Sequence, residues 1–265
     1  MSAVEPADLE HENWIGYLTG VVNCTAGAAV TRADGVVRIL TGLPFDWFNQ
    51  VLIEHEEATP AAVLAGVARA REWGGNFVVR LREGIDDRLI PTLIRAGLAP
   101  AGEATATPGM VALPIEHGAI TGQVAPELEI RQVTDAAGID AHCKVVTAGF
   151  GSDPAVALGT ACPDLLDRSD CVVYIGYAGG APVASGLGWR TGRTIGVFSI
   201  ATIPSARRRG YGAAMTARVV ADGAAVGCDV AALQASEMGR PTYERLGFRT
   251  VVRYAAYVDL PANEA

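Results

Sequence analysis

The chain lacks the features that mark a membrane or exported protein. No apolar run reaches the roughly 20 uncharged residues that a membrane-spanning helix needs, and the N-terminal segment from Glu5 to Glu12 is acidic, opposite to a signal peptide. The five cysteines are odd in number and show no C-x-x-C spacing, which argues against a disulfide framework or a zinc site. We therefore expect a cytoplasmic protein with reduced cysteines, no bound metal and no membrane partner.

Basic residues are also scarce. Lys144 is the single lysine, and the formal net charge is −8. An acidic chain repels nucleic acid, because that binding depends on the neutralisation of phosphates. Half of the 265 residues are hydrophobic, which is enough to bury the core of one large domain or two small ones. The composition predicts a globular protein that does not bind nucleic acid.

One segment is a candidate anion site. The apolar strand 197–203 runs into a basic, glycine-rich turn at 204–212, and a helix-forming stretch follows. Gly210 and Gly212 lack a Cβ, so the backbone can approach a ligand closely, and the N–H groups of the first helical turn can point at negative oxygens. Three consecutive arginines precede the glycines. The pattern predicts that this turn binds a phosphate.

Two common phosphate sites do not fit this spacing. A P-loop has four residues between its glycines and then a lysine, which this turn lacks. A dinucleotide fingerprint has a third small residue where Met215 stands, and an acid at the end of the next strand, whereas Asp229 begins that strand. A nucleotide-binding oxidoreductase is therefore disfavoured.

The remaining pattern, R-x-x-G-x-G (Arg207, Gly210, Gly212), resembles the coenzyme A pyrophosphate loop of the GNAT acyltransferase superfamily. Downstream, residues 233–236 followed by 241–248 resemble the second motif of that superfamily. The resemblance implies an α/β (α+β) fold with a mixed central sheet flanked by helices over residues 127–261. It also implies an N-acyltransferase that uses acyl-coenzyme A, expected to be acetyl-CoA, on a small-molecule or peptide amine. The residues that it places against the cofactor are Ile200, Ala201, Thr202, Arg207, Arg208, Arg209, Gly210, Tyr211, Gly212, Ala213 and Ser236.

Local patterns agree with this order of elements. Asp135 is expected to cap a helix that runs to about Phe150, and Gly179-Gly180 is a hairpin signal between two strands. The predicted strands are 128–133, 171–177, 181–189, 194–203, 229–235 and 249–260, and two further helices are predicted at 210–225 and 239–246.

Acyl transfer to an amine requires a held donor, a polarised thioester carbonyl, a deprotonated amine and a proton for the leaving thiolate. The resemblance implies that the strand carrying Ile200, Ala201 and Thr202 splays from its neighbour, so that its free backbone groups hold pantetheine and the carbonyl. It also implies that Tyr243 protonates the thiolate, since a phenol with a reference pKa of about 10 keeps its proton at neutral pH.

The general base is absent from its expected places. Relatives carry a glutamate on the strand before the pyrophosphate loop or on the strand before the tyrosine helix, and these places fall on Gly196 and Gln234. A water chain, Glu237 or Asp153, and bulk solvent remain open as alternatives, whereas His142 is expected to be structural. The missing carboxylate also keeps a second hypothesis open, a non-catalytic coenzyme A sensor or interaction module.

The N-terminal half shows a candidate internal repeat. Phe48, Pro91-Thr92, Arg95 and Gly97 lie 150 residues before identical residues in the second half. Thr59 and Pro60 look like the N-cap and first residue of a helix to about residue 74, followed by a strand at 76–81, a helix at 86–96 and a strand at 110–113. We therefore predict a tandem duplication, with an unrelated α/β domain as the alternative.

The first half lacks the anion-binding turn. In place of residues 204–212 it has Glu54–Ala62, which brings carboxylates and no glycine, and carboxylates would repel a pyrophosphate. We predict one degenerate GNAT-like or accessory domain at 1–115, a linker at 116–126 and the acetyltransferase domain at 127–265. The oligomeric state, monomer or homodimer, stays open.

Overall fold

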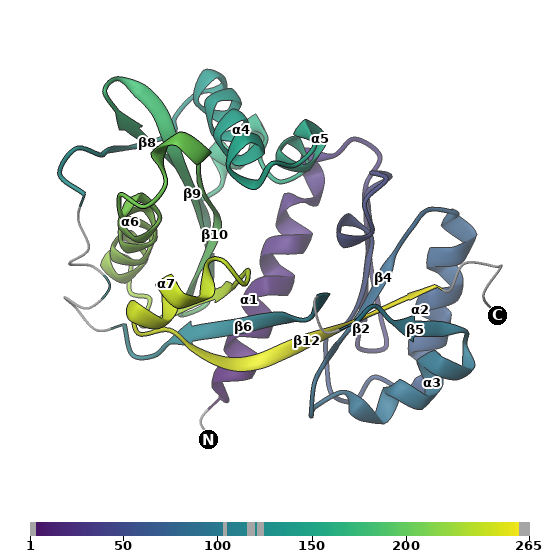
Figure 1. Cartoon of the computed structure of the whole chain (residues 1–265). Coiled ribbons are helices and arrows are strands. Elements are labelled where there is room, and N and C mark those ends of the chain that lie inside the picture. The colour runs from purple at the N-terminus through teal and green to yellow at the C-terminus, as the bar shows by residue number, and fades with distance from the viewer. Residues whose placement is uncertain (1–3, 103–104, 116–119, 121–124, 260–265) are drawn as a thin grey trace. The chain divides into compact units, whose positions relative to one another are not determined.

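The computed structural model of the chain describes residues 4–102, 105–115, 120 and 125–259. The chain folds into two compact units, each built from segments that are far apart in the sequence (Figure 1). Unit 1 contains Met1–Cys24 and Gly109–Val251, and unit 2 contains Thr25–Pro108 and Val252–Ala265.

The sheet of unit 1 is mixed. Its strand order is β7-β8-β9-β10-β11-β6, and every neighbouring pair is antiparallel except β10 and β11, which are parallel. The apolar runs predicted from the sequence form these strands, and Gly179 and Gly180 take positive φ in the turn between β8 and β9. The strands are β6 (Thr107–Ala112), β7 (Glu129–Gln132), β8 (Cys171–Ala178), β9 (Ala181–Thr191), β10 (Thr194–Thr202) and β11 (Val230–Gln234).

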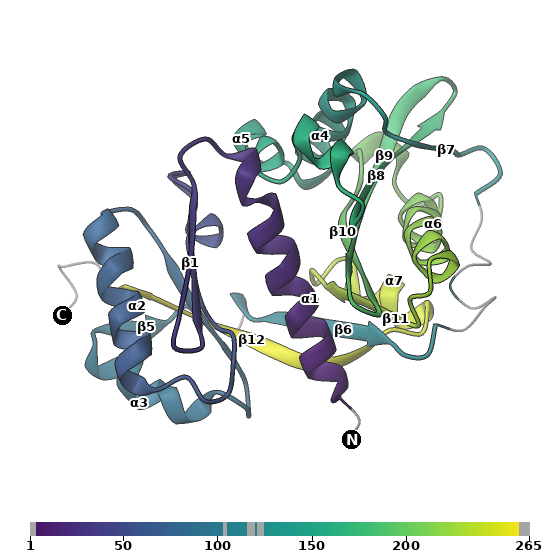
Figure 2. The same cartoon turned by 180° about the vertical axis from the view of Figure 1, so that it is seen from behind.

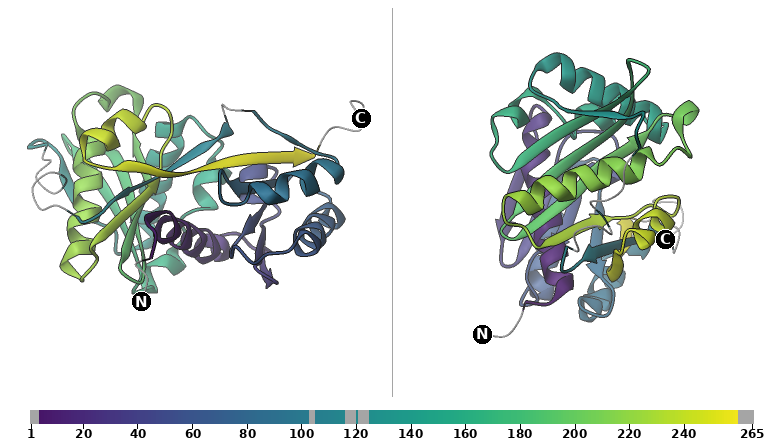
Figure 3. Two further views of the ribbon diagram at one scale, coloured as in Figure 1. Left: turned by 90° about the horizontal axis from the view of Figure 1, so that it is seen from below. Right: turned by 90° about the vertical axis from the view of Figure 1, so that its left-hand side faces the viewer.

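Helices cover both faces of this sheet. α6 (Tyr211–Ala225) packs on one face, where a Cβ on Gly223 would lie 2.6 Å from Ile195 Cβ. α1 (Pro6–Gly20) and α4 (Ala136–Phe150) lie on the other face, as Figure 2 shows for α1 beside β10. Figure 3 shows α6 running along the strands of unit 1. The short helices are α5 (Pro154–Leu158) and α7 (Arg240–Arg245).

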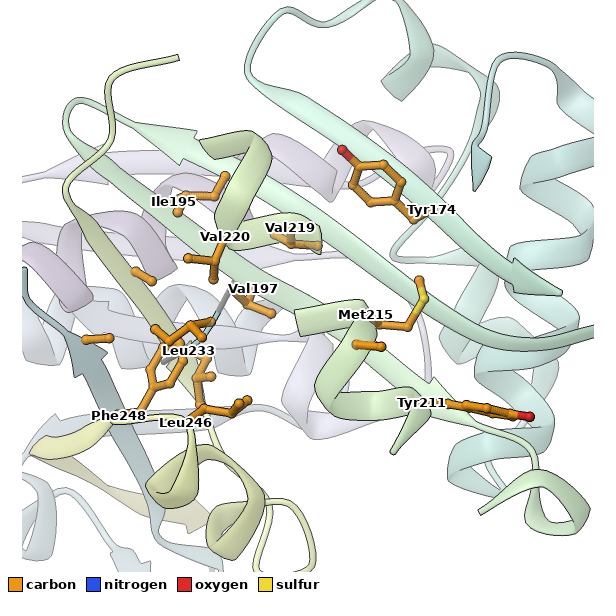
Figure 4. Close-up of a cluster of buried hydrophobic side chains, with 14 of the residues drawn as sticks. Tyr174, Ile195, Val197, Tyr211, Met215, Val219, Val220, Leu233, Leu246 and Phe248 are labelled. Atoms are coloured by element: carbon orange, nitrogen blue, oxygen red, sulfur yellow. The ribbon is translucent and has the colours of Figure 1, made fainter. Parts of the chain in front are cut away.

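The core between α6 and the sheet is apolar. Ile195 and Val197 of β10 pack with Met215, Val219 and Val220 of α6 (Figure 4). These helix residues recur at the spacing of one helical face, which is why the segment forms a helix against the sheet. The packing fixes the start of α6 relative to β10.

Unit 2 has the same kind of topology on a smaller scale. Its strand order is β1-β2-β3-β4-β12, with β5 also paired to β12, and β3 and β4 are its parallel pair. The strands are β1 (Ala29–Ala33), β2 (Val36–Leu40), β3 (Gln50–Ile53), β4 (Val78–Arg82), β5 (Leu98–Pro100) and β12 (Arg249–Asp259), and the helices are α2 (Pro60–Trp73) and α3 (Ile90–Arg95).

The two units confirm the predicted duplication. In each, a strand is followed by a helix and a parallel strand, and then by a short helix. This is β3-α2-β4-α3 in unit 2 and β10-α6-β11-α7 in unit 1, and α3 and α7 occupy positions 150 residues apart. The fold is therefore a mixed α/β tandem architecture.

The units divide the chain elsewhere than at the predicted linker. α1 belongs to unit 1 although it precedes unit 2 in the sequence, and residues 252–259 of β12 pair with β4 and β5 of unit 2. β6, at the end of the first half, pairs with β11 of unit 1. β6, from the predicted domain 1–115, thus pairs with a strand of the predicted domain 127–265. β12, from the second of these, pairs with strands of the first. Of the predicted linker 116–126, residues 116–119 and 121–124 lie outside the described residues.

Candidate functional site

The strands β10 and β11 part halfway along their length. They pair over three positions, from Thr194 and Val230 to Gly196 and Ala232. Beyond these, among the residues that the structure describes, β10 pairs with β9 alone, and the register shifts between Phe198 and Ala201. In this bulge Ser199 takes a φ of 51°, and the Ser185 hydroxyl donates a 2.9 Å hydrogen bond to its carbonyl oxygen. A bulge bends a strand and leaves backbone groups outside the ladder.

The predicted splay therefore exists, and it contains Ile200, Ala201 and Thr202. Ile200 packs against the core beneath α6, whereas Ala201 faces α4, because a Cβ on Gly149 would lie 2.7 Å from Ala201 Cβ. Backbone groups on the β11 side of this stretch therefore lie outside the β10–β11 ladder.

The start of α6 is open to an anion. Gly210 is its N-cap with a φ of 79°, and no side chain of the described residues caps it. The helical ladder begins with the Ala214 N–H, which donates to the Gly210 carbonyl oxygen at 3.0 Å. The N–H groups of Tyr211, Gly212 and Ala213 precede that ladder and thus have no acceptor within the helix.

The three arginines of the turn differ in their surroundings. Arg207 donates from Nη2 to the Gly149 carbonyl oxygen at 2.6 Å and from Nε to the Thr202 carbonyl oxygen at 3.3 Å. It therefore ties the turn to the end of α4 and to β10, satisfying carbonyls that a helix terminus leaves without partners. Arg208, with a φ of 63°, and Arg209 are exposed.

Tyr211 presents its backbone, and not its ring, at the candidate site. Its ring is 1% exposed and lies in the core beside Met215 (Figure 4). The side chain thus anchors the first turn of α6 and leaves its N–H at the helix end. The spacing of the motif gives no indication of this division of roles.

Tyr243 and Ser236 lie at the helix that follows β11. The Tyr243 ring packs edge-on to Phe248 with centroids 6.0 Å apart, and burial raises the pKa of its hydroxyl to about 12. The phenol is therefore protonated at any physiological pH. The exposed Ser236 accepts a 3.1 Å hydrogen bond on its hydroxyl from the Gly239 N–H, which shapes the turn into α7.

The other acid and base candidates have structural surroundings. Asp153 caps α5 by accepting from the Ala155 N–H at 2.8 Å, and Glu237 is exposed. His142 is fully buried, its Nδ1 lies 3.3 Å from the Tyr174 carbonyl oxygen, and burial lowers its pKa to about 4. It is neutral at pH 7, in agreement with a structural role.

Helix α1, which the sequence analysis did not predict, reaches both places where a glutamate was expected. A Cβ on Gly196 would lie 2.0 Å from Asn13 Oδ1, and Gln234 donates from Nε2 to Glu10 Oε1 at 2.5 Å. Pro6 at the first turn was the available signal for a helix start. The buried positions of α1 include Glu10, His11 and Asn13, so they form no simple apolar stripe.

Two wider findings concern metals and membranes. Within the described ranges, no three His, Cys, Asp or Glu side chains gather as a metal site would require. Among the helices of these ranges, none has the length and apolar character needed to cross a bilayer.

Comparison with known proteins shows which family and which solved structures this chain resembles. The acetyltransferase (GNAT) family matches residues 150–248. A GCN5-related N-acetyltransferase from Kribbella flavida is 17% identical with a TM-score of 0.69, covering 96% of this chain and 97% of that one. Another from Sphaerobacter thermophilus is 15% identical with a TM-score of 0.59, covering 97% and 94%. A search of curated proteins found no match.

A tandem GNAT protein from the clavulanic acid biosynthesis pathway is 11% identical with a TM-score of 0.61, covering 99% of this chain and 98% of that one. At such identities the likeness concerns the fold. Residues 150–248 thus match the acetyltransferase (GNAT) family, and the chain shares the fold of these GNAT structures.

Proposed function

We propose that the protein is an acyl-coenzyme A dependent N-acyltransferase that transfers an acetyl group directly to an amine in a ternary complex. The observation that carries this proposal is the parting of β10 and β11 beside the uncapped start of α6. The parted strand offers backbone donors to an extended thioester arm, and the helix start offers N–H groups to a pyrophosphate.

The donor is held at two places. Its pyrophosphate lies on the N–H groups of Tyr211, Gly212 and Ala213, with Arg208 and Arg209 supplying positive charge from the exposed turn. Its pantetheine arm follows the backbone of residues 200–202. The bulge at Ser199 turns this part of β10 away from β11, which makes room for the arm and aims an N–H at the thioester carbonyl.

Tyr243 completes the chemistry on the donor side. The acceptor nitrogen forms a bond to the thioester carbon as the carbon–sulfur bond breaks, and the Tyr243 hydroxyl gives its proton to the leaving thiolate. The tyrosine then regains a proton from the nitrogen of the new amide through water. A phenol with a raised pKa suits this step because it keeps its proton until the thiolate forms.

The acceptor is a small-molecule or peptide amine. We expect the segment 150–170, which contains α5, to select it. We propose that unit 2 acts as an accessory domain without a coenzyme A site of its own.

The test combines binding and turnover. Coenzyme A should raise the melting temperature, since it binds the native state, and acetyl-CoA should release thiol when a panel of amines is added. Tyr243→Phe should lower kcat about 100-fold while the coenzyme A stabilisation persists. Tyr177→Phe, on β8, is the matched control and should behave like the wild type.

A non-catalytic coenzyme A binder is the second candidate, favoured by the absence of a carboxylate at positions 196 and 234. It predicts stabilisation by coenzyme A but an equal, background release of thiol by the wild type and Tyr243→Phe with every amine. That result would reject the enzyme in favour of the binder.

A further inference from the structure

The two strand positions that lack a carboxylate are both in contact with α1. Glu10 accepts the hydrogen bond from Gln234 Nε2, and Asn13, three residues later on the same helix face, lies against Gly196. Glu10 is 0% exposed. The helix thus brings a buried carboxylate to the β11 position at which the family pattern would lead one to look for a base.

The place of Glu10 is fixed by close packing of α1 on the sheet. The Tyr17 ring stacks on Phe198 with centroids 3.7 Å apart and planes 8° apart. A Cβ on Gly20 would lie 2.0 Å from the Trp189 ring, and Asn13 Nδ2 donates to the Trp189 carbonyl oxygen at 3.0 Å. A helix held at these contacts has little freedom to shift, so Glu10 stays at the end of β11.

This end of β11 is the part that β10 has left. The last position paired with β10 is Ala232, and Gln234 lies two residues further along. Leu233 packs in the core beneath α6, so the alternation of a strand turns Gln234 to the opposite face, where α1 lies. Glu10 therefore stands beside the parted stretch on the face that α6 does not cover.

A buried carboxylate here calls for a chemical explanation. Burial of a carboxylate costs free energy unless hydrogen bonds compensate it, and Gln234 supplies one such bond. What a carboxylate adds is the ability to take a proton. The residues that β10 and β11 place against this stretch of α1, namely Gly196, Phe198 and Gln234, are uncharged. On the helix itself, Asp8, His11 and Glu12 are the neighbouring titratable groups.

We propose that Glu10 is the general base of the acyl transfer, supplied by the N-terminal helix in place of a strand glutamate. This proposal rests on the proposed function. The acceptor ammonium gives one proton to the Glu10 carboxylate and becomes a neutral amine, which then attacks the thioester carbon. Glu10 returns that proton to water after the amide and the free thiol have left, and Gln234 holds the carboxylate in place through its amide N–H.

The first test replaces Glu10 by its neutral isostere. Glu10→Gln should lower kcat at least 100-fold at neutral pH, while the melting temperature and the affinity for coenzyme A stay at the wild-type values. The activity that remains should lose the fall at acidic pH that protonation of the carboxylate causes in the wild type. Glu12→Gln removes an exposed carboxylate two residues away and should change none of these quantities.

The second test moves the carboxylate. In the double variant Glu10→Gln/Gln234→Glu the acid stands on β11 and the amide on α1, so the pair is kept with its partners exchanged. We expect at least tenfold recovery of kcat over Glu10→Gln together with a restored acidic limb. This readout separates a base from a residue that merely packs, because packing would not follow the carboxylate.

Two results overturn the assignment while leaving the proposed function intact. One is a wild type that releases thiol and a Glu10→Gln variant whose kcat lies within twofold of it. The other is a slow Glu10→Gln variant with an unchanged pH profile. If the wild type itself releases no thiol with any amine, the proposed function fails, and the role of Glu10 fails with it.

Discussion

Helices α2 and α6 follow equivalent strands in the two units, yet their first turns are built in opposite ways. α2 is capped by Thr59, whose hydroxyl accepts a hydrogen bond from the Ala62 N–H at 3.2 Å. α6 starts at Gly210, which has no side chain to do this. A side chain therefore caps the first turn of α2. Among the described residues, no side chain caps the first turn of α6.

The residues that precede α2 and α6 also differ. Before α2, Glu54 pairs with Arg32 at 2.7 Å, and Arg88 donates to the Ala58 carbonyl oxygen at 2.8 Å. The Glu54 carboxylate and the Ala58 carbonyl group of this turn thus have partners within the protein. Before α6, Arg208 and Arg209 are exposed. The tyrosine position differs as well, since Leu93 is 0% exposed at the place in unit 2 that corresponds to Tyr243. The two units thus differ at the turn to which we assign coenzyme A binding.

The largest effect on stability should come from the buried ion pair of unit 2. Arg82 Nε lies 3.1 Å from Asp86 Oδ2, and both side chains are almost fully buried. Arg82→Met leaves a buried carboxylate without its cation and should lower the free energy of unfolding by about 3–5 kcal/mol in urea titrations. Arg69→Met breaks the exposed pair with Glu72 and should cost less than about 1 kcal/mol. Equal losses would show that unit 2 is not held by this pair.

Acid should act on unit 1 through His142. Its native pKa of about 4 lies below the ordinary 6.5, so the unfolded state takes up the proton first, and stability is lost as the pH falls from 6.5 towards 4. The loss should approach about 3 kcal/mol, and His142→Leu should remove it. Hydrogen exchange of peptides from each unit would locate the change. Faster exchange confined to unit 2 would contradict this account.

The exposed arginines should affect binding and leave stability unchanged. Arg208→Ala with Arg209→Ala should weaken coenzyme A binding about tenfold, because charge-assisted contacts to the phosphates are lost. The wild-type affinity should also fall more steeply with salt than that of the variant. Arg95→Ala in unit 2 is the control. An unchanged affinity in the double variant would remove these side chains from the site.

The smallest effect should come from the cap of α2. Thr59→Ala should lower stability by about 1 kcal/mol, measured by thermal unfolding, without any change in coenzyme A affinity. Tighter binding in this variant would mean that unit 2 retains a phosphate site beneath its cap.

The elements were largely predictable from the sequence, because each depends on local signals. Asp135 and Thr59 cap their helices as predicted, and the 150-residue spacing placed α3 and α7 in register. The partners of β6 and β12 were not predictable, since strand patterns say which face is buried but not which neighbour a strand will take. The compact units therefore have other bounds than the domains that we predicted from the sequence.

The site was predictable where a motif carries it and not where packing does. Gly210 and the splayed strand followed from the motifs. The motifs did not predict that Arg207 donates a hydrogen bond to the Gly149 carbonyl oxygen or that the side chain of Tyr211 is buried. The contact of Glu10 with Gln234 joins residues 224 positions apart. No local pattern reports such a contact, and the polar residues on the buried side of α1 hide the helix from an apolar-periodicity test.

A calorimetric titration with coenzyme A tests the contrast between the two units most directly. We predict one molecule bound per chain, with an affinity that Arg208→Ala/Arg209→Ala weakens and Thr59→Ala does not change. Two molecules per chain, or binding that depends on Thr59 and not on the arginines, would contradict it.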